Sequence, residues 1–237
     1  GGAAMNPEVE EFFHRIKFPF TIGYGMTECA PLISFTPDNE FKAGSCGRYL
    51  KGLLDVRIDS PDPEHVAGEI VVRGEHVMKG YYKNEKDTEK VLEPDGWLHT
   101  GDIAKIDKDG HIYITGRIKN MIVLSGGKKV FPEEVESVLE KSPMFAEVCV
   151  FGASRKDGSK EGTEDIVAVV VPKEEIIEKT ADDRELETII RHEAKILSER
   201  LAPYKRPINI IVKKDALPKT TTRKLKRQEI KKEFAAV

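Results

Sequence analysis

The sequence has 237 residues, of which 39% are hydrophobic and 33% charged, and its formal net charge is −3. This composition is ordinary for a globular protein, and the slightly negative total excludes binding of polyanions by bulk electrostatics. No apolar run approaches the roughly 20 residues that span a bilayer. The length suffices for one large domain or two modest ones.

The sequence contains three cysteines, Cys29, Cys46 and Cys149. Their odd number, their wide spacing and the lack of a CxxC pair argue against a disulfide framework and against a zinc site. We therefore expect small, buried or half-buried residues in a reducing, cytoplasmic environment.

The first half is predicted to be a small antiparallel β unit. A short helix is expected over residues 8–16, and short strands broken by Gly, Pro and Asp follow from about 18 to 116. The strands with the clearest signals cover residues 55–59, 68–73, 102–107 and 111–115. The last two flank Lys108-Asp109-Gly110, and an Asp-Gly pair between alternating apolar residues indicates a hairpin. The spacing around this turn does not fit a calcium loop, and no distal glutamate is in place.

The second half alternates strands with helices, which predicts a compact α+β domain. Strand-like runs cover residues 121–124, 146–151, 165–171 and 208–212. One helix is opened by Pro132, at a first-turn position that tolerates proline, and another is expected near 183–201. The predicted fold class is α+β, with a β-rich part over 1–116, a hinge at 117–120 and a small domain over 121–237.

Five glycine-punctuated polar clusters follow one another along the chain. They are Gly23-Tyr24-Gly25-Met26-Thr27-Glu28, residues 68–74 with 80–82, residues 96–102, residues 116–120 with 125–136, and residues 218–224. Glycine lets the backbone approach a ligand, basic residues with glycines suit phosphate, and a carboxylate suits Mg²⁺. Each cluster alone has a plain alternative as a turn, a strand or a solvated charge, and for residues 68–74 the strand is the better explanation.

In this order the clusters resemble the adenylate-forming family that contains acyl-CoA synthetases, nonribosomal-peptide adenylation domains and firefly luciferase. The resemblance covers essentially the whole chain. It implies use of ATP and Mg²⁺ to make an acyl-adenylate, then transfer of the acyl group to a thiol, usually of coenzyme A. It also implies that the α+β domain is a mobile C-terminal lid.

The start Gly1-Gly2-Ala3-Ala4-Met5 does not look natural, so we expect a piece of a longer enzyme. The resemblance implies that the phosphate loop and the acyl pocket lie before residue 1. We therefore expect the piece alone to have little or no ligase activity.

The resemblance assigns nucleotide contacts to Gly2, Ala3, Ala4, Tyr24, Gly25, Thr27, Asp102 and Arg117. Within this set, Tyr24 resembles the aromatic residue that stacks on adenine, Thr27 a phosphate contact and Asp102 the ligand of the ribose hydroxyls. Glu28 matches the carboxylate that holds Mg²⁺. Ala4 stands where the family has proline.

The resemblance gives the remaining roles to the second half of the chain. Lys119 matches the hinge, and Ser125-Gly126-Gly127 matches the loop beside the coenzyme A channel. Lys224 matches the catalytic lysine, whose ammonium stabilises charge as a carboxylate attacks the α-phosphate. Arg223 replaces the glycine that the family often has before this lysine.

The acid is expected to be a long-chain fatty acid, because Gly-Tyr-Gly-Met-Thr-Glu and Pro-Lys-Thr-Thr-Thr-Arg-Lys resemble bacterial long-chain synthetases. Delivery to an acyl carrier protein, or another adenylate-forming ligase, stays open as an alternative. The basic stretch after Ala202 leaves a non-enzymatic alternative, a nucleotide or nucleic-acid binding module. Since it lacks interleaved aromatic residues, we favour a solvated face near ATP and coenzyme A phosphates and expect no nucleic acid partner. If the substrate is a fatty acid, the basic stretch could also make peripheral contact with anionic lipid at the inner membrane face.

Overall fold

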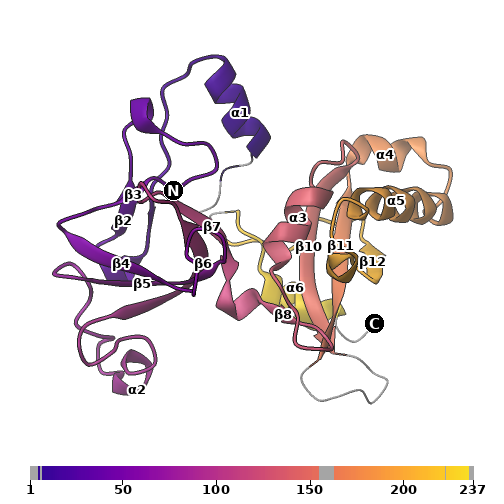
Figure 1. Ribbon diagram of the computed structural model, residues 1–237. Coiled ribbons are helices and arrows are strands. Elements are labelled where there is room, and N and C mark those ends of the chain that lie inside the picture. The colour runs from indigo at the N-terminus through magenta and orange to yellow at the C-terminus, as the bar shows by residue number, and fades with distance from the viewer. Residues whose placement is uncertain (1–4, 6, 155–162, 222, 235–237) are drawn as a thin grey trace. The chain divides into compact units, whose positions relative to one another are not determined.

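The computed structural model describes residues 5, 7–154, 163–221 and 223–234 (Figure 1). The chain forms two compact units, Gly1–Lys119 and Asn120–Val237. The dividing point falls inside the segment 117–120. That this segment acts as a hinge stays a prediction.

The first unit contains two antiparallel sheets. The smaller one has the order β1-β2-β3, and the larger one β4-β5-β6-β7, in which each strand pairs with the next along the chain. The strands are β1 (Tyr24–Gly25), β2 (Leu32–Phe35), β3 (Arg48–Tyr49), β4 (Leu54–Asp59), β5 (Gly68–Gly74), β6 (Leu98–Ile106) and β7 (Ile112–Arg117). The core between them includes Ile33, Ile70 and Leu98, all with no exposed surface. The predicted antiparallel β unit is confirmed.

The described part of the first unit also contains the helices α1 (Pro7–Arg15) and α2 (Glu85–Thr88) and the 3-10 turns Thr27–Cys29 and Asp38–Glu40. A further 3-10 turn, Ile118–Asn120, crosses the boundary between the two units. The apolar residues of α1 are partly in solvent, with Val9 44% and Phe12 56% exposed. Phe13 is the inward ring, with its centroid 5.2 Å from that of Phe18 and 5.5 Å from that of Phe20.

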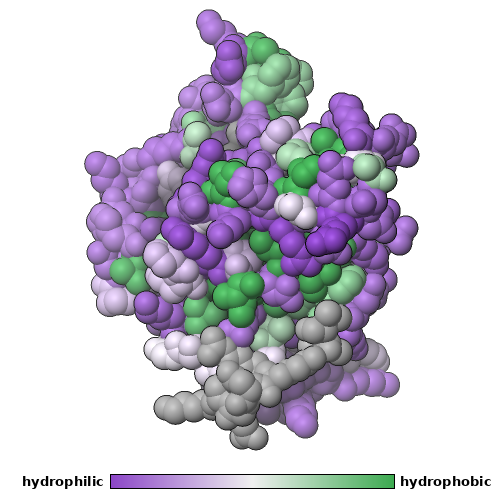
Figure 2. All heavy atoms as spheres, turned by 90° about the vertical axis from the view of Figure 1, so that its right-hand side faces the viewer, coloured by the Kyte–Doolittle hydropathy of each residue, from purple (hydrophilic) through white to green (hydrophobic). Residues whose placement is uncertain are grey.

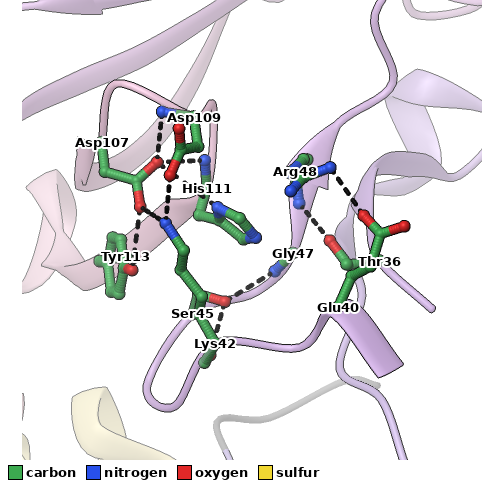
Figure 3. Close-up of polar contacts among 10 residues, drawn as sticks. All are labelled: Thr36, Glu40, Lys42, Ser45, Gly47, Arg48, Asp107, Asp109, His111 and Tyr113. Carbon is green, nitrogen blue, oxygen red and sulfur yellow. Dashed lines mark hydrogen bonds and ion pairs between the residues drawn. The ribbon is translucent and has the colours of Figure 1, made fainter. Parts of the chain in front are cut away.

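The turn between β6 and β7 is fixed by a lysine from outside the hairpin (Figure 3). The Lys42 ammonium lies 2.8 Å from Asp107 Oδ2 and 2.6 Å from Asp109 Oδ2. Asp107 Oδ1 accepts from the backbone N–H groups of Asp109 (3.0 Å) and His111 (2.9 Å). Asp107, Asp109 and His111 are close enough to surround a cation. However, the Lys42 ammonium is already paired with both carboxylates, so we assign this cluster a structural role.

The second unit is a three-stranded sheet with helices on both faces (Figure 1). The strands of the sheet are β10 (Phe145–Ser154), β11 (Glu164–Pro172) and β12 (Asn209–Val212). A hairpin of β8 (Ile122–Val123) and β9 (Lys129–Val130) lies beside them. The helices are α3 (Pro132–Leu139), α4 (Glu174–Lys179), α5 (Asp183–Ser198) and α6 (Arg227–Phe234), and a 3-10 turn covers Pro203–Lys205. β10 and β11 are antiparallel, whereas β11 and β12 are parallel. The expected α+β class is confirmed.

Alternate residues of β10 and β11 enter two different cores, because side chains in a strand point to opposite faces. Val148 and Val150 pack with residues of α3 and α5. Cys149 and Phe151 pack on the other face with Ile230 of α6. The unbroken apolar run of these strands therefore follows from burial on both sides. Cys149 is buried like Cys29, and Cys46 is partly buried, as expected from the sequence.

Arg227, at the start of α6, contradicts the expected solvated face. Its side chain is only 17% exposed, and its Nη2 lies 2.6 Å from both carboxylate oxygens of Glu136 on α3. Its Nε donates to the Val150 carbonyl (2.9 Å), while Val150 N–H donates to Glu136 Oε1 (2.7 Å). The sequence predicts a generic basic helix, but this arginine is a largely buried bridge between α6, α3 and β10.

Other basic residues after Ala202 are also paired with carboxylates. Lys213 contacts Glu233 at 2.8 Å, and Lys231 contacts Glu164 at 2.6 Å. This pairing lowers the positive charge available to a polyanion. The expectation that no nucleic acid binds stays a prediction.

The surface on the side of the second unit is mostly hydrophilic, with hydrophobic side chains in small separate patches (Figure 2). Exposed hydrophobic residues of this unit include Ile196, 47% exposed, and Ile208, 66% exposed. In the described part of the chain, no helix has the length and apolar character needed to cross a membrane. Scattered apolar residues of this kind are normal on a protein surface.

Candidate functional site

A register shift between β5 and β6 of the larger sheet interrupts the regular strand pairing at the segment Thr100–Asp102. Glu69 on β5 pairs with Ile103 on β6, and Val71 pairs with His99, so residues 69 to 71 face residues 99 to 103. Extra residues on one strand form a bulge, which bends the strand and redirects a side chain. The bulge therefore sets where Asp102 points.

Local hydrogen bonds hold this bulge. Gly101 has a φ of +71°, a left-handed conformation that glycine adopts without strain. The Thr100 hydroxyl donates to the Ile70 carbonyl (2.8 Å) and accepts from the Asp102 N–H (3.1 Å). The Gly101 N–H donates to Glu69 Oε1 (2.9 Å).

Asp102 lies at the centre of a buried polar group. Its residue surface is 3% exposed, Arg117 Nε lies 2.7 Å from its Oδ1, and the Tyr24 hydroxyl donates to its Oδ2 (2.7 Å). The ladder between β6 and β7 places Arg117 directly opposite Asp102. Burial, with the Asp102 charge adding to it, raises the pKa of Tyr24 well above its usual value. Tyr24 therefore stays a neutral donor and Asp102 an oriented acceptor.

Asp102 and Arg117 border a cavity of about 660 Å³, and the described residues that line it all belong to the first unit. Six residues singled out from the sequence line it: Gly25, Thr27, Glu28, Asp102, Arg117 and Lys119. They come from three clusters that are far apart in the chain. Tyr24 contacts the site through the hydrogen bond from its hydroxyl to Asp102, and the residue is 8% exposed. Its role in stacking on adenine stays a prediction.

The first motif turns sharply at the edge of the cavity. A Cβ on Gly25 would lie 1.9 Å from the Pro31 carbonyl oxygen, so only glycine fits there. The adjacent Met26 N–H donates to that carbonyl (2.7 Å). Thr27 is exposed at the start of the next turn, and the Tyr81 hydroxyl donates to Glu28 Oε1 (3.0 Å).

Two further cavity residues, Glu69 and His99, lie within the second and third glycine-punctuated clusters, but the sequence assigns neither of them a role. Glu69 Oε2 lies 2.8 Å from His99 Nδ1, and Glu93 Oε1 lies 2.8 Å from His99 Nε2. The Glu69 hydrogen bond raises the pKa of His99, although burial works against it. For Glu69 the sequence contains only a weak signal, a lone acidic residue ahead of the apolar run Ile70-Val71-Val72, which also fits an exposed strand face.

The other predicted site residues are not among those that line this cavity in the described part of the chain. Gly2, Ala3 and Ala4 fall outside the described residues. Residues 125–127 form the tip of the β8–β9 hairpin, where Gly126 and Gly127 have φ values of +90° and +78°. Their role beside coenzyme A stays a prediction.

Lys224 belongs to the second unit and is exposed. Its N–H donates to the Thr220 hydroxyl (3.1 Å), and its carbonyl accepts from the Thr220 N–H (2.8 Å). Arg223 has a φ of +62°, in the left-handed region that favours glycine. The backbone therefore adopts the form expected of the family's glycine, despite the arginine.

Two family models match the chain. The model described as "AMP-binding enzyme" matches residues 1–82, and the model of its C-terminal domain matches residues 134–224. The chain is 32% identical over 249 residues to 4-coumarate–CoA ligase 1 of Glycine max. It is 38% identical over 157 residues, 66% of the chain, to a long-chain-fatty-acid–CoA ligase of Gallus gallus.

A solved structure agrees with these relatives. The o-succinylbenzoate–CoA synthetase of Bacillus subtilis, in complex with its acyl-adenylate intermediate, matches 98% of the chain with a TM-score of 0.78 and 32% identity. The same synthetase is solved with ATP and a magnesium ion, with a TM-score of 0.75. The chain belongs to the adenylate-forming AMP-binding enzymes, in the group of acid–CoA ligases.

The chain spans only part of most of these proteins. It covers 79% of the soybean ligase, 20% of the chicken ligase and 45% of the Bacillus synthetase. The printed names of the relatives differ in the acid, so the family does not fix the substrate.

Proposed function

We propose that this chain takes part in the AMP-forming ligation of a carboxylic acid to coenzyme A through an acyl-adenylate. The observation that carries the proposal is the cavity in the first unit, which gathers Thr27, Glu28, Asp102 and Arg117 from three separate motifs. Such convergence of polar groups on one cavity is typical of a ligand site.

The arrangement supports distinct tasks for these side chains. Asp102 is held by Arg117 Nε and by the Tyr24 hydroxyl, and an oriented carboxylate of this kind suits the hydroxyls of a ribose. Arg117 is half exposed, so part of its guanidinium can reach an anionic ligand. The Thr27 hydroxyl suits a phosphate oxygen. Gly25 lets a nucleotide approach the backbone closely.

Glu28 fits a hard cation. One carboxylate oxygen accepts from Tyr81, and the other has no hydrogen-bond partner among the described residues. Mg²⁺ prefers such oxygens and keeps several waters and substrate phosphate oxygens in its shell. When bound, the ion neutralises phosphate charge, while Glu28 fixes its place.

Lys224 is proposed as the catalytic group. Attack by a carboxylate on the α-phosphate brings two anions together, and one ammonium can stabilise both. Lys119 is proposed as the hinge and Ser125-Gly126-Gly127 as a coenzyme A contact. These roles rest on the resemblance of the motifs.

We further propose that the acid is a long-chain fatty acid. The support is the motif resemblance, together with 38% identity to a long-chain ligase over two thirds of the chain. Because 4-coumarate and o-succinylbenzoate ligases match as well, the acid has to be tested directly.

The test is acyl transfer by the full-length enzyme from which we expect this chain to come. Fatty acids of 6 to about 18 carbons, 4-coumarate and o-succinylbenzoate are offered with ATP and Mg²⁺, and either coenzyme A or an acyl carrier protein as acceptor. We expect the highest kcat/KM for a long-chain acid with coenzyme A. Preference for an aromatic acid, or turnover with carrier protein alone, contradicts the finer proposal but not the ligase class.

A further inference from the structure

Glu69 links the wall of the cavity to the bulge that carries Asp102. One of its oxygens accepts from the Gly101 N–H (2.9 Å), and the other contacts His99 Nδ1 (2.8 Å). The side chain is 16% exposed and lines the cavity. Both oxygens are therefore used to hold the β6 backbone and one of its side chains.

The bulge depends on the hydrogen bond from the Gly101 N–H to Glu69. The register shift takes Gly101 out of the ladder with β5, so its N–H has no strand carbonyl opposite. An unpaired backbone N–H in a partly buried position costs stability and lets the segment adopt other conformations. Glu69 supplies the missing acceptor from the neighbouring strand.

His99 in turn restrains Glu69. Its second ring nitrogen is held by Glu93 Oε1 at 2.8 Å, and that oxygen also lies 2.8 Å from Arg57 Nη2. The imidazole is thus fixed from both sides. A side chain whose rotamer is locked by such contacts can position a neighbour accurately.

We propose that Glu69, held by His99, is a positioning residue that fixes the Thr100–Asp102 bulge so that Asp102 meets the nucleotide ribose. Glu69 acts through a hydrogen bond to the backbone and makes no contact with the reacting atoms. The ribose contact rests on the proposed function, whereas the restraint of the bulge does not.

Two measurements test this in parallel. Hydrogen exchange at the Gly101 amide, followed by NMR, reports the restraint in the protein itself. AMP binding to the full-length enzyme, followed by calorimetry, reports its consequence. The variants are Glu69→Ala, which removes the acceptor, and Glu69→Gln, which keeps an acceptor oxygen; Glu75→Ala removes an exposed carboxylate of the same unit as a control.

We expect Glu69→Ala to lose protection at Gly101 and to bind AMP about threefold to tenfold more weakly, as for one lost hydrogen bond. Glu69→Gln should keep the protection and most of the affinity, and Glu75→Ala should match wild type. If Glu69→Ala does not fold, Glu69→Asp serves instead, since the shorter side chain cannot reach both partners.

Three results would overturn the inference. They are unchanged protection in Glu69→Ala, lost protection with unchanged AMP affinity, and equal losses in Glu69→Ala and Glu69→Gln. Failure of the wild-type enzyme to bind AMP contradicts the proposed function instead, and the exchange measurement still decides whether Glu69 restrains the bulge.

Discussion

Arg223 holds a backbone conformation that costs an L-residue about 1–2 kcal/mol relative to the right-handed region. Its φ is +62°, next to Lys224. Arg223→Gly should raise the free energy of unfolding of the second unit by up to about 1 kcal/mol, because the relieved strain exceeds the added chain entropy of glycine. Urea denaturation measures it.

Arg200→Gly is the matched control for this change, since Arg200 is not among the described residues with positive φ. It should destabilise the unit, because glycine there adds only chain entropy. A destabilising Arg223→Gly of the same size would show that the left-handed conformation carries no strain.

Asp107 is expected to make the first unit sensitive to acid. Burial alone would raise its pKa, but hydrogen bonds from Lys42 and from the His111 and Asp109 N–H groups hold the pKa well below its usual value. A depressed pKa contributes stability that is present above the unfolded pKa, about 3.9, and is lost as pH falls toward the folded pKa.

Asp107→Asn should therefore destabilise the unit at pH 7 and flatten its loss of Tm below about pH 4. Thermal unfolding between pH 7 and pH 2.5 measures both effects. Asp95→Asn, at an exposed carboxylate of the same unit, should leave the profile unchanged. An Asp107→Asn profile parallel to that of wild type would contradict the account.

The sequence predicts the residue types of the site better than their contacts. Thr27, Glu28, Asp102 and Arg117 are all found from motifs, and all line one cavity. Glu69 is not found as a site residue, because a carboxylate just before the apolar run Ile70-Val71-Val72 is expected to face solvent. Only the register shift between β5 and β6 turns it toward Gly101, and such a shift leaves no mark in local periodicity.

At the scale of elements, α6 depends on the bridge from Arg227 to Glu136. Arg227→Met should cost about 3 kcal/mol or more, because it leaves a buried carboxylate without its partner. Urea denaturation of the protein measures the loss. Adding Glu136→Leu to Arg227→Met should recover much of it, since the uncompensated charge is then gone.

Arg191→Met provides the control for the bridge. Arg191 contacts Glu187 at 3.4 Å on the exposed face of α5, and such surface pairs contribute about 0–1 kcal/mol. Equal losses in Arg191→Met and Arg227→Met would mean that the buried bridge adds nothing special to the second unit.

The long elements are predicted more completely than the short ones. β10, β11 and α5 carry enough apolar residues to show their period and lie within a few residues of their expected bounds, and α3 begins at Pro132 as expected. β8 lies within the expected run 121–124, whereas β1, β3 and β9 have two residues each, too few for any period. The parallel pairing of β11 with β12 joins distant segments, which local pattern cannot indicate.

At the scale of the whole molecule, two compact units carry different parts of the proposed chemistry. The first unit contains the cavity with the nucleotide and metal candidates, and the second contains Lys224. The proposed reaction needs both, because the acid and the nucleotide phosphate are both anionic where they meet.

The most direct test is acid-dependent exchange of pyrophosphate into ATP by the full-length enzyme, which reports adenylate formation alone. We expect exchange that requires a carboxylic acid and Mg²⁺ and falls about 100- to 1000-fold in Lys224→Ala, the loss typical of one transition-state donor. Exchange at the wild-type rate in Lys224→Ala would remove the lysine from the mechanism. No exchange by the wild-type enzyme with any acid would contradict the account as a whole.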